Sequence, residues 1–220
     1  MKDKETIRFS WRQYQCLKAA AVLMAVLAAG ALFACWTVQR TDREMRANLL
    51  EQTRMIAQAI NIESIQSLSG TERDLNNPDY TRIKEQLSAV RLGNPQCRFL
   101  YLMGRKCDGT VFFFVDSERA GSKDYSPPGQ VYDEIMEDYR RVFDTKAEAV
   151  VGPATDRWGT WISGLVPISY QQNEPVLAVL GMDIDACTWK RNVATKVVLP
   201  VGLVLVMLLC VFAACCCPPR

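Results

Sequence analysis

Residues 97–116 read CRFLYLMGRKCDGTVFFFVD, and this stretch decides the fold of the part of the chain that lies between two long apolar runs. Two aromatic and aliphatic segments, 97–103 and 110–116, flank a polar segment that contains Asp108 and Gly109. Aromatic and β-branched residues favour strands, and Asp-Gly between two such segments is typical of a hairpin. The stretch therefore predicts two antiparallel strands.

Further strands and helices are expected on both sides of this hairpin. Residues 149–151, 160–169 and 175–183 have strand-like composition, with a turn at 170–174 between the last two. A helix should begin near Pro78, which suits the first position of a helix, and end near Gly93. A shorter helix is expected at 131–142. The order predicts an α+β fold, with an antiparallel sheet and helices on one of its faces.

A long helix is predicted to precede this part of the chain. Between residues 40 and 67, apolar residues recur at helical spacing at Met45, Leu49, Ile56 and Ile60. The stripe is widened by Leu50, Ala57 and Ala59. We expect one side of it to pack on the sheet and another to pack on a second copy in a homodimer. The alternative is that the whole stripe serves the core of one chain.

Two uncharged apolar runs, 19–38 and 197–217, bracket the predicted domain. Each is about 20 residues long, and a helix of that length spans the hydrocarbon core of a bilayer of roughly 30 Å. We expect two transmembrane helices, a folded domain at 39–196 and a short C-terminal end at 218–220. The long leader and the extended apolar core favour an uncleaved anchor over a signal peptide.

The charge before the first run predicts the orientation. Basic residues near a spanning helix stay in the cytoplasm, so residues 1–18 should be cytoplasmic and the domain extracytoplasmic. These basic residues are Lys2, Lys4, Arg8, Arg12 and Lys18. Basic residues also follow the first run and precede the second, and these oppose the assignment.

Composition excludes several functions. The chain has no histidine, which rules out Ser-His-Asp and Cys-His nucleophile systems and histidine-ligated zinc. A net charge of +2 gives no reason to expect a nucleic-acid partner. Of nine cysteines, only Cys97, Cys107 and Cys187 fall in the domain, where one disulfide or free thiols are both open. We expect no enzyme activity, no cofactor and no metal.

Aromatic residues and carboxylates on the strands predict a small-molecule pocket. Strict alternation would place Phe112, Phe114 and Asp116 on one face of their strand, and Trp161 and Ser163 on one face of theirs. Aromatic rings with paired carboxylates suit a cationic or amine-bearing ligand. The candidate residues are Tyr101, Phe112, Phe114, Asp116, Arg157, Trp158, Trp161, Ser163 and Asp183, the last expected to end the final strand.

Two alternatives remain for this pocket. Arg157 can neutralise Asp116 or bind a carboxylate ligand instead. In a purely structural interpretation, Trp158 and Trp161 belong to the core, and Asp156 and Asp183 cap turns.

Several segments together resemble extracytoplasmic PAS-like sensor domains of the Cache (PDC) type. They are FLYLM at 99–103, VFFFVDS at 111–117, PPGQVY at 127–132, the stretch from Gly152-Pro153 to DRWGTWIS at 156–163, and VLGMDID at 179–185. The resemblance extends from about residue 40 to residue 189. It implies a PAS-like fold in a bacterial membrane receptor, where such a domain precedes cytoplasmic PAS, histidine-kinase, diguanylate-cyclase or chemoreceptor modules.

The resemblance also implies a function. We expect a multi-pass protein of the bacterial inner membrane whose periplasmic domain binds a small ligand and passes a conformational signal across the membrane. Only Pro218-Pro219-Arg220 follow the second apolar run, so we expect an input-only protein, a fragment or a truncated reading frame. The alternative role is that of a structural or assembly partner of a full-length receptor, without a ligand of its own.

Overall fold

The computed structural model describes residues 2–171 and 174–216, and the chain divides into two compact units. One unit, Glu44–Lys190, contains the sheet; the other contains the residues before Glu44 and after Lys190. Helices α1 (Lys2–Ala59) and α5 (Ala186–Cys216) each contribute to both units. Among the described residues, these two helices are long and apolar enough to cross a membrane.

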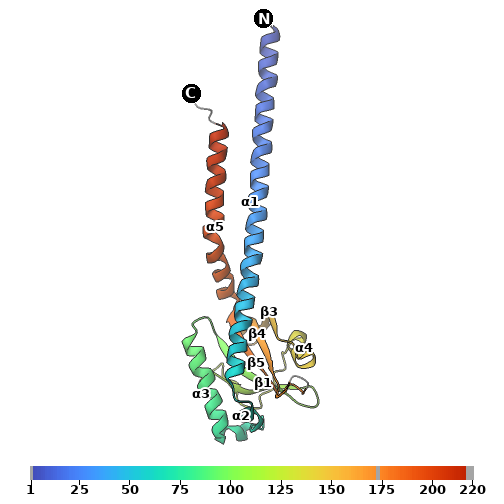
Figure 1. Ribbon diagram of the computed structural model, residues 1–220, viewed down its shortest axis with the longest axis vertical. Helices are drawn as coiled ribbons and strands as arrows, with labels where there is room; N and C mark the ends of the chain where they lie inside the picture. Colours follow the sequence, from blue (N-terminus) through green and yellow to red (C-terminus); the bar gives the residue numbers. More distant parts are fainter. Residues whose placement is uncertain (1, 172–173, 217–220) are drawn as a thin grey trace. The chain divides into compact units, whose positions relative to one another are not determined.

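The sheet has the antiparallel architecture that the sequence predicts. Within the described ranges it contains five strands, in the order β2-β1-β5-β4-β3 (Figure 1). Their bounds are Phe99–Arg105 (β1), Val111–Asp116 (β2), Ala149–Asp156 (β3), Gly159–Ile168 (β4) and Ala178–Asp185 (β5). The α+β, PAS-like fold is therefore confirmed. Residues 172 and 173 of the expected turn, and 217–220 at the C-terminus, lie outside the described residues.

The long N-terminal helix ends earlier than expected, at Ala59 instead of residue 67. Asn61 adopts an extended conformation and its side chain accepts hydrogen bonds from the amides of Glu63 and Ser64, so a new short helix, α2 (Ile62–Gln66), begins there. A 3₁₀ helix, η1 (Glu72–Asn76), follows. Helix α3 (Pro78–Gly93) then has the expected bounds, with Asn77 as its N-cap.

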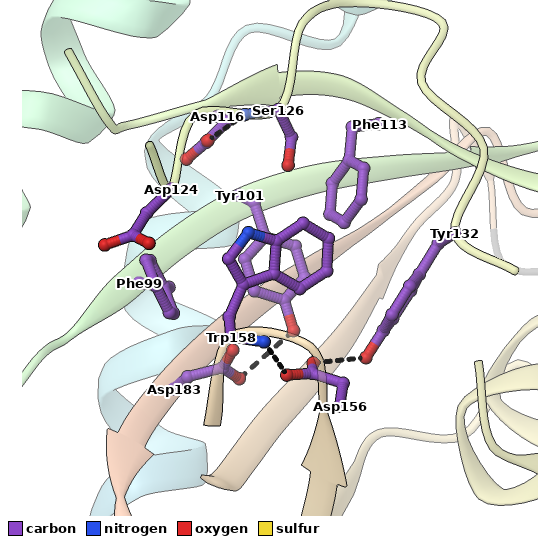
Figure 2. Close-up of a pocket in the computed structure, with 10 residues that line it drawn as sticks. All are labelled: Phe99, Tyr101, Phe113, Asp116, Asp124, Ser126, Tyr132, Asp156, Trp158 and Asp183. Carbon is purple, nitrogen blue, oxygen red and sulfur yellow. Dashed lines mark hydrogen bonds between the residues drawn. The ribbon is translucent and has the colours of Figure 1, made fainter. Parts of the chain in front are cut away.

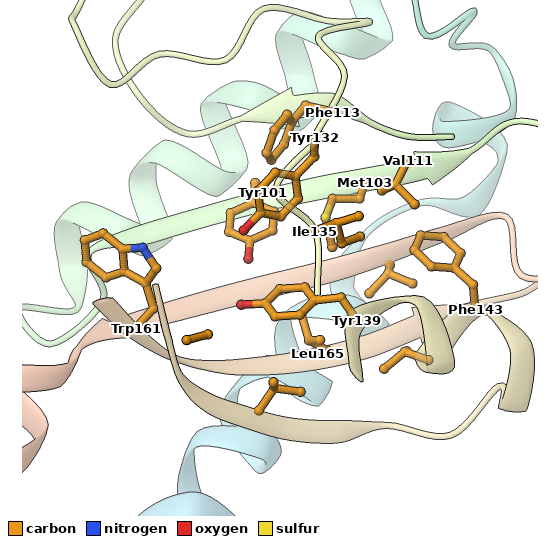
Figure 3. Packing of buried hydrophobic residues seen from close by; sticks show 14 of the residues in the cluster. Tyr101, Met103, Val111, Phe113, Tyr132, Ile135, Tyr139, Phe143, Trp161 and Leu165 are labelled. Atoms are coloured by element: carbon orange, nitrogen blue, oxygen red, sulfur yellow. The ribbon is translucent and has the colours of Figure 1, made fainter. Parts of the chain in front are cut away.

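Helices cover both faces of the sheet, so the expectation of helices on one face is wrong. Helix α1 lies against β4, because a Cβ added at Gly164 would come 2.6 Å from Thr53 Oγ1. Helix α4 (Glu137–Thr145) lies on the opposite face, where Tyr139 and Phe143 join the aromatic core with Trp161 (Figures 1 and 3).

Helix α4 also begins six residues later than expected, because the segment before it pairs with β2. Gln130 O accepts from Phe113 N at 3.0 Å, and Tyr132 N donates to Val111 O at 2.9 Å. Residues 130–132 are thus held in an extended conformation along the edge of the sheet. This pairing brings Tyr132 onto the face that α4 covers.

The apolar stripe on α1 mostly serves the core of this domain. Met45, Leu49, Ala57 and Ile60 are all buried. Met55 is 57% exposed and remains available for a second chain. The dimer surface on α1 therefore stays a prediction. In the domain, Cys97, Cys107 and Cys187 are free thiols, and Cys97 is buried.

Candidate functional site

A small pocket lies on the face of the sheet that carries the aromatic core (Figure 2). Ten described residues line it: Phe99, Tyr101, Phe113, Asp116, Asp124, Ser126, Tyr132, Asp156, Trp158 and Asp183. Four of these side chains are carboxylates and five are aromatic rings, and none of the ten is basic. The free space within it is about 20 Å³, which has room for about one water molecule.

The pocket depends on a bulge in β2. Tyr101 pairs with Asp116 and Leu102 with Val115, but Met103 pairs with Phe113, so Phe114 is an extra residue. The bulge shifts the alternation of side chains by one position. It places Phe113 and Asp116, three residues apart, on the same face as Tyr101.

Asp183 is a buried carboxylate of the pocket and is 4% exposed. It pairs with Ser163 across β4 and β5. The sequence predicted that Asp183 ends the final strand, but β5 continues for two more residues, to Asp185. The Tyr101 hydroxyl donates to Asp183 Oδ1 at 3.1 Å, and the Tyr139 hydroxyl donates to Ser163 Oγ at 2.7 Å. Burial raises the pKa of Asp183 to about 7, although hydrogen bonds from Ser163 and Tyr101 oppose the shift.

Asp116 ends β2 and is 4% exposed. Its Oδ1 accepts from Glu118 N at 3.0 Å, and its Oδ2 accepts from Ser126 N at 2.8 Å. Burial raises its pKa to about 6, and the two backbone hydrogen bonds limit the rise. One carboxylate thus holds both ends of the loop at 117–126, which contributes Asp124 and Ser126 to the pocket wall.

Asp156 has two roles at the turn between β3 and β4. Its Oδ1 caps the turn by accepting from Trp158 N at 2.9 Å and Gly159 N at 3.1 Å, and it also accepts from Trp161 Nε1 at 2.9 Å. Its Oδ2 accepts from the Tyr132 hydroxyl at 2.8 Å. The structural interpretation of Asp156 as a turn cap is therefore right, and the same carboxylate also lines the pocket. Among the residues described, no group of three or more carboxylates or thiols is placed to hold a metal ion.

The structure brings some of the candidate residues to this pocket. Tyr101, Asp116, Trp158 and Asp183 line it. Two others lie directly behind it. Ser163 hydrogen-bonds Asp183, and Trp161 packs edge-on against Phe99 with ring centroids 5.0 Å apart.

The other three candidate residues lie away from the pocket. Phe112 and Phe114 contact each other, with ring centroids 4.7 Å apart, over Gly104 on the opposite face, because the bulge reverses the expected alternation. Arg157 does not neutralise Asp116. Its guanidinium pairs with Glu134 at 2.8 Å and with Asp133, and it stacks on Trp158.

Six lining residues were not among the candidates: Phe99, Phe113, Asp124, Ser126, Tyr132 and Asp156. Tyr132 and Asp156 belong to the segments that carry the family resemblance, so that resemblance was the signal that could have found them. Strict alternation would place Phe113 on the face opposite Asp116, and only the bulge brings it to the pocket. Asp124 comes from an irregular loop, where no periodicity predicts which side chains face inward.

Comparison with solved structures gives the same class of fold, whereas no protein-family model and no curated protein matches the chain. The ligand-binding domain of the Campylobacter jejuni chemoreceptor Tlp3, in complex with L-valine, superimposes with a TM-score of 0.52 at 16% identity, over 80% of this chain and 66% of that one. The sensory domain of Tlp3 gives a TM-score of 0.52 at 15% identity, over 79% and 66%. The form with isoleucine bound gives 0.51 at 19%, over 80% and 66%.

This chain thus covers just under two thirds of the length of the solved sensory domains it matches. At such identities the likeness is one of fold. The fold is that of chemoreceptor sensory domains, and the PAS-like fold expected from the Cache-type resemblance is confirmed.

Proposed function

We propose that the chain is a membrane-anchored sensor input that binds a small amine-bearing cation in the pocket described above. The observation that carries the proposal is the pocket's charge. Four carboxylates and five aromatic rings meet there, and none of the ten described lining residues is basic. Aromatic rings and carboxylates both attract an ammonium group, most strongly where water is excluded.

The ligand class differs from a simple amino acid. The Tlp3 domains are complexes with L-valine and with isoleucine, which carry an ammonium and a carboxylate. In this chain the nearby Arg157 is engaged by Asp133 and Glu134, and Arg98, beside the pocket, is engaged by Glu118 and Asp124. A ligand carboxylate would therefore have to compete with these acidic partners for either guanidinium. We therefore favour an amine without a carboxylate.

Binding requires the pocket to open. A space of about 20 Å³ cannot hold an organic amine, so one wall must move when the ligand enters. A ligand that binds the open form better than the closed form shifts the population toward it, and this shift is the signal.

The membrane arrangement belongs to the same proposal. Residues 1–18 are cytoplasmic, 19–38 and 197–217 span a bacterial inner membrane, and 39–196 form the extracytoplasmic domain. Helices α1 and α5 each combine a predicted span with residues of the folded domain, which supports a route for the signal. A homodimer through the exposed side of α1 around Met55 completes the proposal.

The test is ligand-dependent stability of the full chain in detergent micelles. Thermal unfolding is followed by tryptophan fluorescence with butylammonium, valine or butyrate present. We expect butylammonium to raise the melting temperature, because a ligand that binds only the folded state stabilises it. Stabilisation by butyrate, with none by butylammonium, would overturn the assignment.

Variants locate the effect. Asp183→Asn keeps the acceptor for Tyr101 but removes the charge, and it should abolish the stabilisation by butylammonium. Asp138→Asn is the matched control, because Asp138 is an exposed carboxylate on α4 that does not line the pocket. Equal responses of both variants would place binding elsewhere.

A further inference from the structure

The loop at 117–126 separates the pocket from helix α3. On its inner side, Asp124 and Ser126 line the pocket, and Asp116 holds both ends of the loop through Glu118 N and Ser126 N. A change at the Asp116 carboxylate therefore alters the whole loop rather than a single side chain.

On its outer side, the loop is bound by one face of α3. Lys84, Ser88 and Arg91 are spaced four and three residues apart, so they share this face. Lys84 Nζ donates to the carbonyl oxygens of Asp116 and Glu118, each at 2.7 Å. The Ser88 hydroxyl donates to Ser117 O at 2.9 Å, and Arg91 pairs with the Glu118 carboxylate at 3.4 Å.

Lys84 is the central residue of this contact. It is half-buried, its ammonium lies 4.5 Å from the centre of the Tyr125 ring, and it donates to two backbone carbonyls of the loop and its start. Tyr125 is also tied to α3 by a hydroxyl–hydroxyl hydrogen bond of 3.0 Å to Tyr80. A cation that binds the backbone of a loop at two points moves with that loop.

Helix α3 in turn contacts the last turns of α1. Gln86 Nε2 donates to Ala59 O at 3.2 Å, and Asn94 Nδ2 donates to Gln52 Oε1 at 3.0 Å. The pocket, the loop, α3 and the end of α1 thus form one continuous series of hydrogen bonds within the unit Glu44–Lys190.

We propose that the loop at 117–126 is the movable wall of the pocket and that Lys84 couples its position, through α3, to the end of α1. The inference rests on the proposed function for the identity of the pocket. An ammonium ligand near Asp116 and Asp124 would compete for the carboxylates that hold the loop through hydrogen bonds and an ion pair. Lys84 acts through the loop backbone, and it is a positioning residue for the pocket wall.

The coupling is tested without any ligand, by hydrogen–deuterium exchange of the full chain in detergent micelles. Asp116→Asn is the trigger, because the carboxamide nitrogen cannot accept from an amide and so releases one end of the loop. The trigger is examined in the wild type and with Lys84→Met, which keeps the aliphatic stem and removes the donors. Arg82→Met is the matched control, since Arg82 pairs with Asp79 on the exposed face of the same helix.

We expect Asp116→Asn to speed exchange in residues 117–126 and, by roughly threefold or more, in residues 52–59. With Lys84→Met present, Asp116→Asn should still speed exchange in the loop but should no longer speed it in residues 52–59. With Arg82→Met present, both should respond. If Asp116→Asn unfolds the sheet, as shown by exchange in β4 and β5, then Asp124→Asn, which releases the loop from Arg98, is the trigger.

Two results would overturn the coupling. In the first, Asp116→Asn speeds exchange in residues 117–126 but leaves exchange in residues 52–59 unchanged. In the second, Asp116→Asn speeds exchange in residues 52–59 as much with Lys84→Met as without it. Neither result bears on amine binding, because no ligand is added. Conversely, a chain that is not stabilised by butylammonium can still show this coupling.

Discussion

The two faces of the sheet are buried to the same degree but carry different chemistry. The face against α1 and α3 presents aliphatic residues at every second position of a strand, among them Leu100, Leu102, Leu180, Met182 and Ile184, all at most 4% exposed. The pocket face presents Tyr101, Phe113 and Trp161, together with Asp116, Ser163 and Asp183, all at most 6% exposed. Because neighbouring residues of one strand alternate between these faces, the same strands serve packing on one side and a charged pocket on the other.

The two faces therefore make opposite contributions to the stability of the fold. The aliphatic face gains stability from apolar area removed from water, at about 25 cal/mol for each Å². The pocket face contains buried carboxylates, whose ionised forms are disfavoured by burial and lack a cation among the lining residues described. The second face therefore costs stability at neutral pH, and a cationic ligand would offset that cost.

The largest expected effect is the pH dependence of stability that Asp183 imposes. In the folded chain, its carboxyl group keeps its proton up to about pH 7, whereas an unfolded Asp loses it near pH 4. The folded state binds more protons between these values, so the free energy of unfolding should fall as the pH rises from 4 to 7. At about 1.4 kcal/mol for each pKa unit, the fall amounts to several kcal/mol at most.

Urea unfolding of the full chain at pH 5, 6, 7 and 8 measures this dependence. Asp183→Asn should flatten most of the profile and be more stable than the wild type at pH 8, leaving a smaller slope near pH 6 from Asp116. Asp138→Asn, on the exposed side of α4, should retain the wild-type profile. A wild-type stability that rises from pH 5 to pH 8 would contradict the prediction.

A second effect compares the two faces directly through a pair of glycines. Gly164 on β4 and Gly181 on β5 are one register position apart, but an added Cβ would meet different neighbours. At Gly164 it would come 2.6 Å from Thr53 Oγ1 of α1, and at Gly181 it would overlap the Tyr101 ring. Each Gly→Ala change should destabilise the chain by about 1–3 kcal/mol through overpacking.

The two variants should differ in binding. Gly181→Ala displaces the Tyr101 ring and with it the hydrogen bond to Asp183, so stabilisation by butylammonium should be lost. Gly164→Ala affects the contact with α1 and should retain the stabilisation by butylammonium. Adding Thr53→Ala to Gly164→Ala should restore much of the lost stability, because it removes the clashing hydroxyl. Loss of the butylammonium response in both variants would mean that the faces are not independent.

The sequence predicts the aliphatic face better than the pocket face, for a physical reason. Packing on a helix needs only apolar residues at regular spacing, and the hairpin at 97–116 and the stripe of Met45 and Leu49 show that spacing. The pocket depends on exceptions to it. The bulge at Phe114 moves Phe113 and Asp116 to one face, and no single residue in VFFFVD marks where the extra residue falls.

Other parts of the pocket depend on contacts between distant segments. Asp124 reaches it from an irregular loop that Asp116 and α3 hold in place, and Tyr132 reaches it because residues 130–132 pair with β2 rather than forming a helix. Asp183 was a candidate from its carboxylate alone, although the strand continues past it to Asp185. Such contacts become visible only when the chain is folded.

The smallest expected effect is that of Trp158→Ala, which enlarges the pocket face without touching the aliphatic face. Trp158 is half-buried on the turn between β3 and β4, and its ring lies 6.0 Å from the rings of Phe113 and Tyr132. A fully buried aromatic costs about 3–5 kcal/mol to truncate, and partial exposure should reduce this to about 1 kcal/mol. Because the indole forms part of the pocket wall, its removal should make room for a bulkier amine. The ratio of the stabilisation by cyclohexylammonium to that by butylammonium should therefore be higher in the variant than in the wild type. Thermal unfolding with each amine measures this ratio, and an unchanged ratio would mean that Trp158 does not limit the size of the ligand.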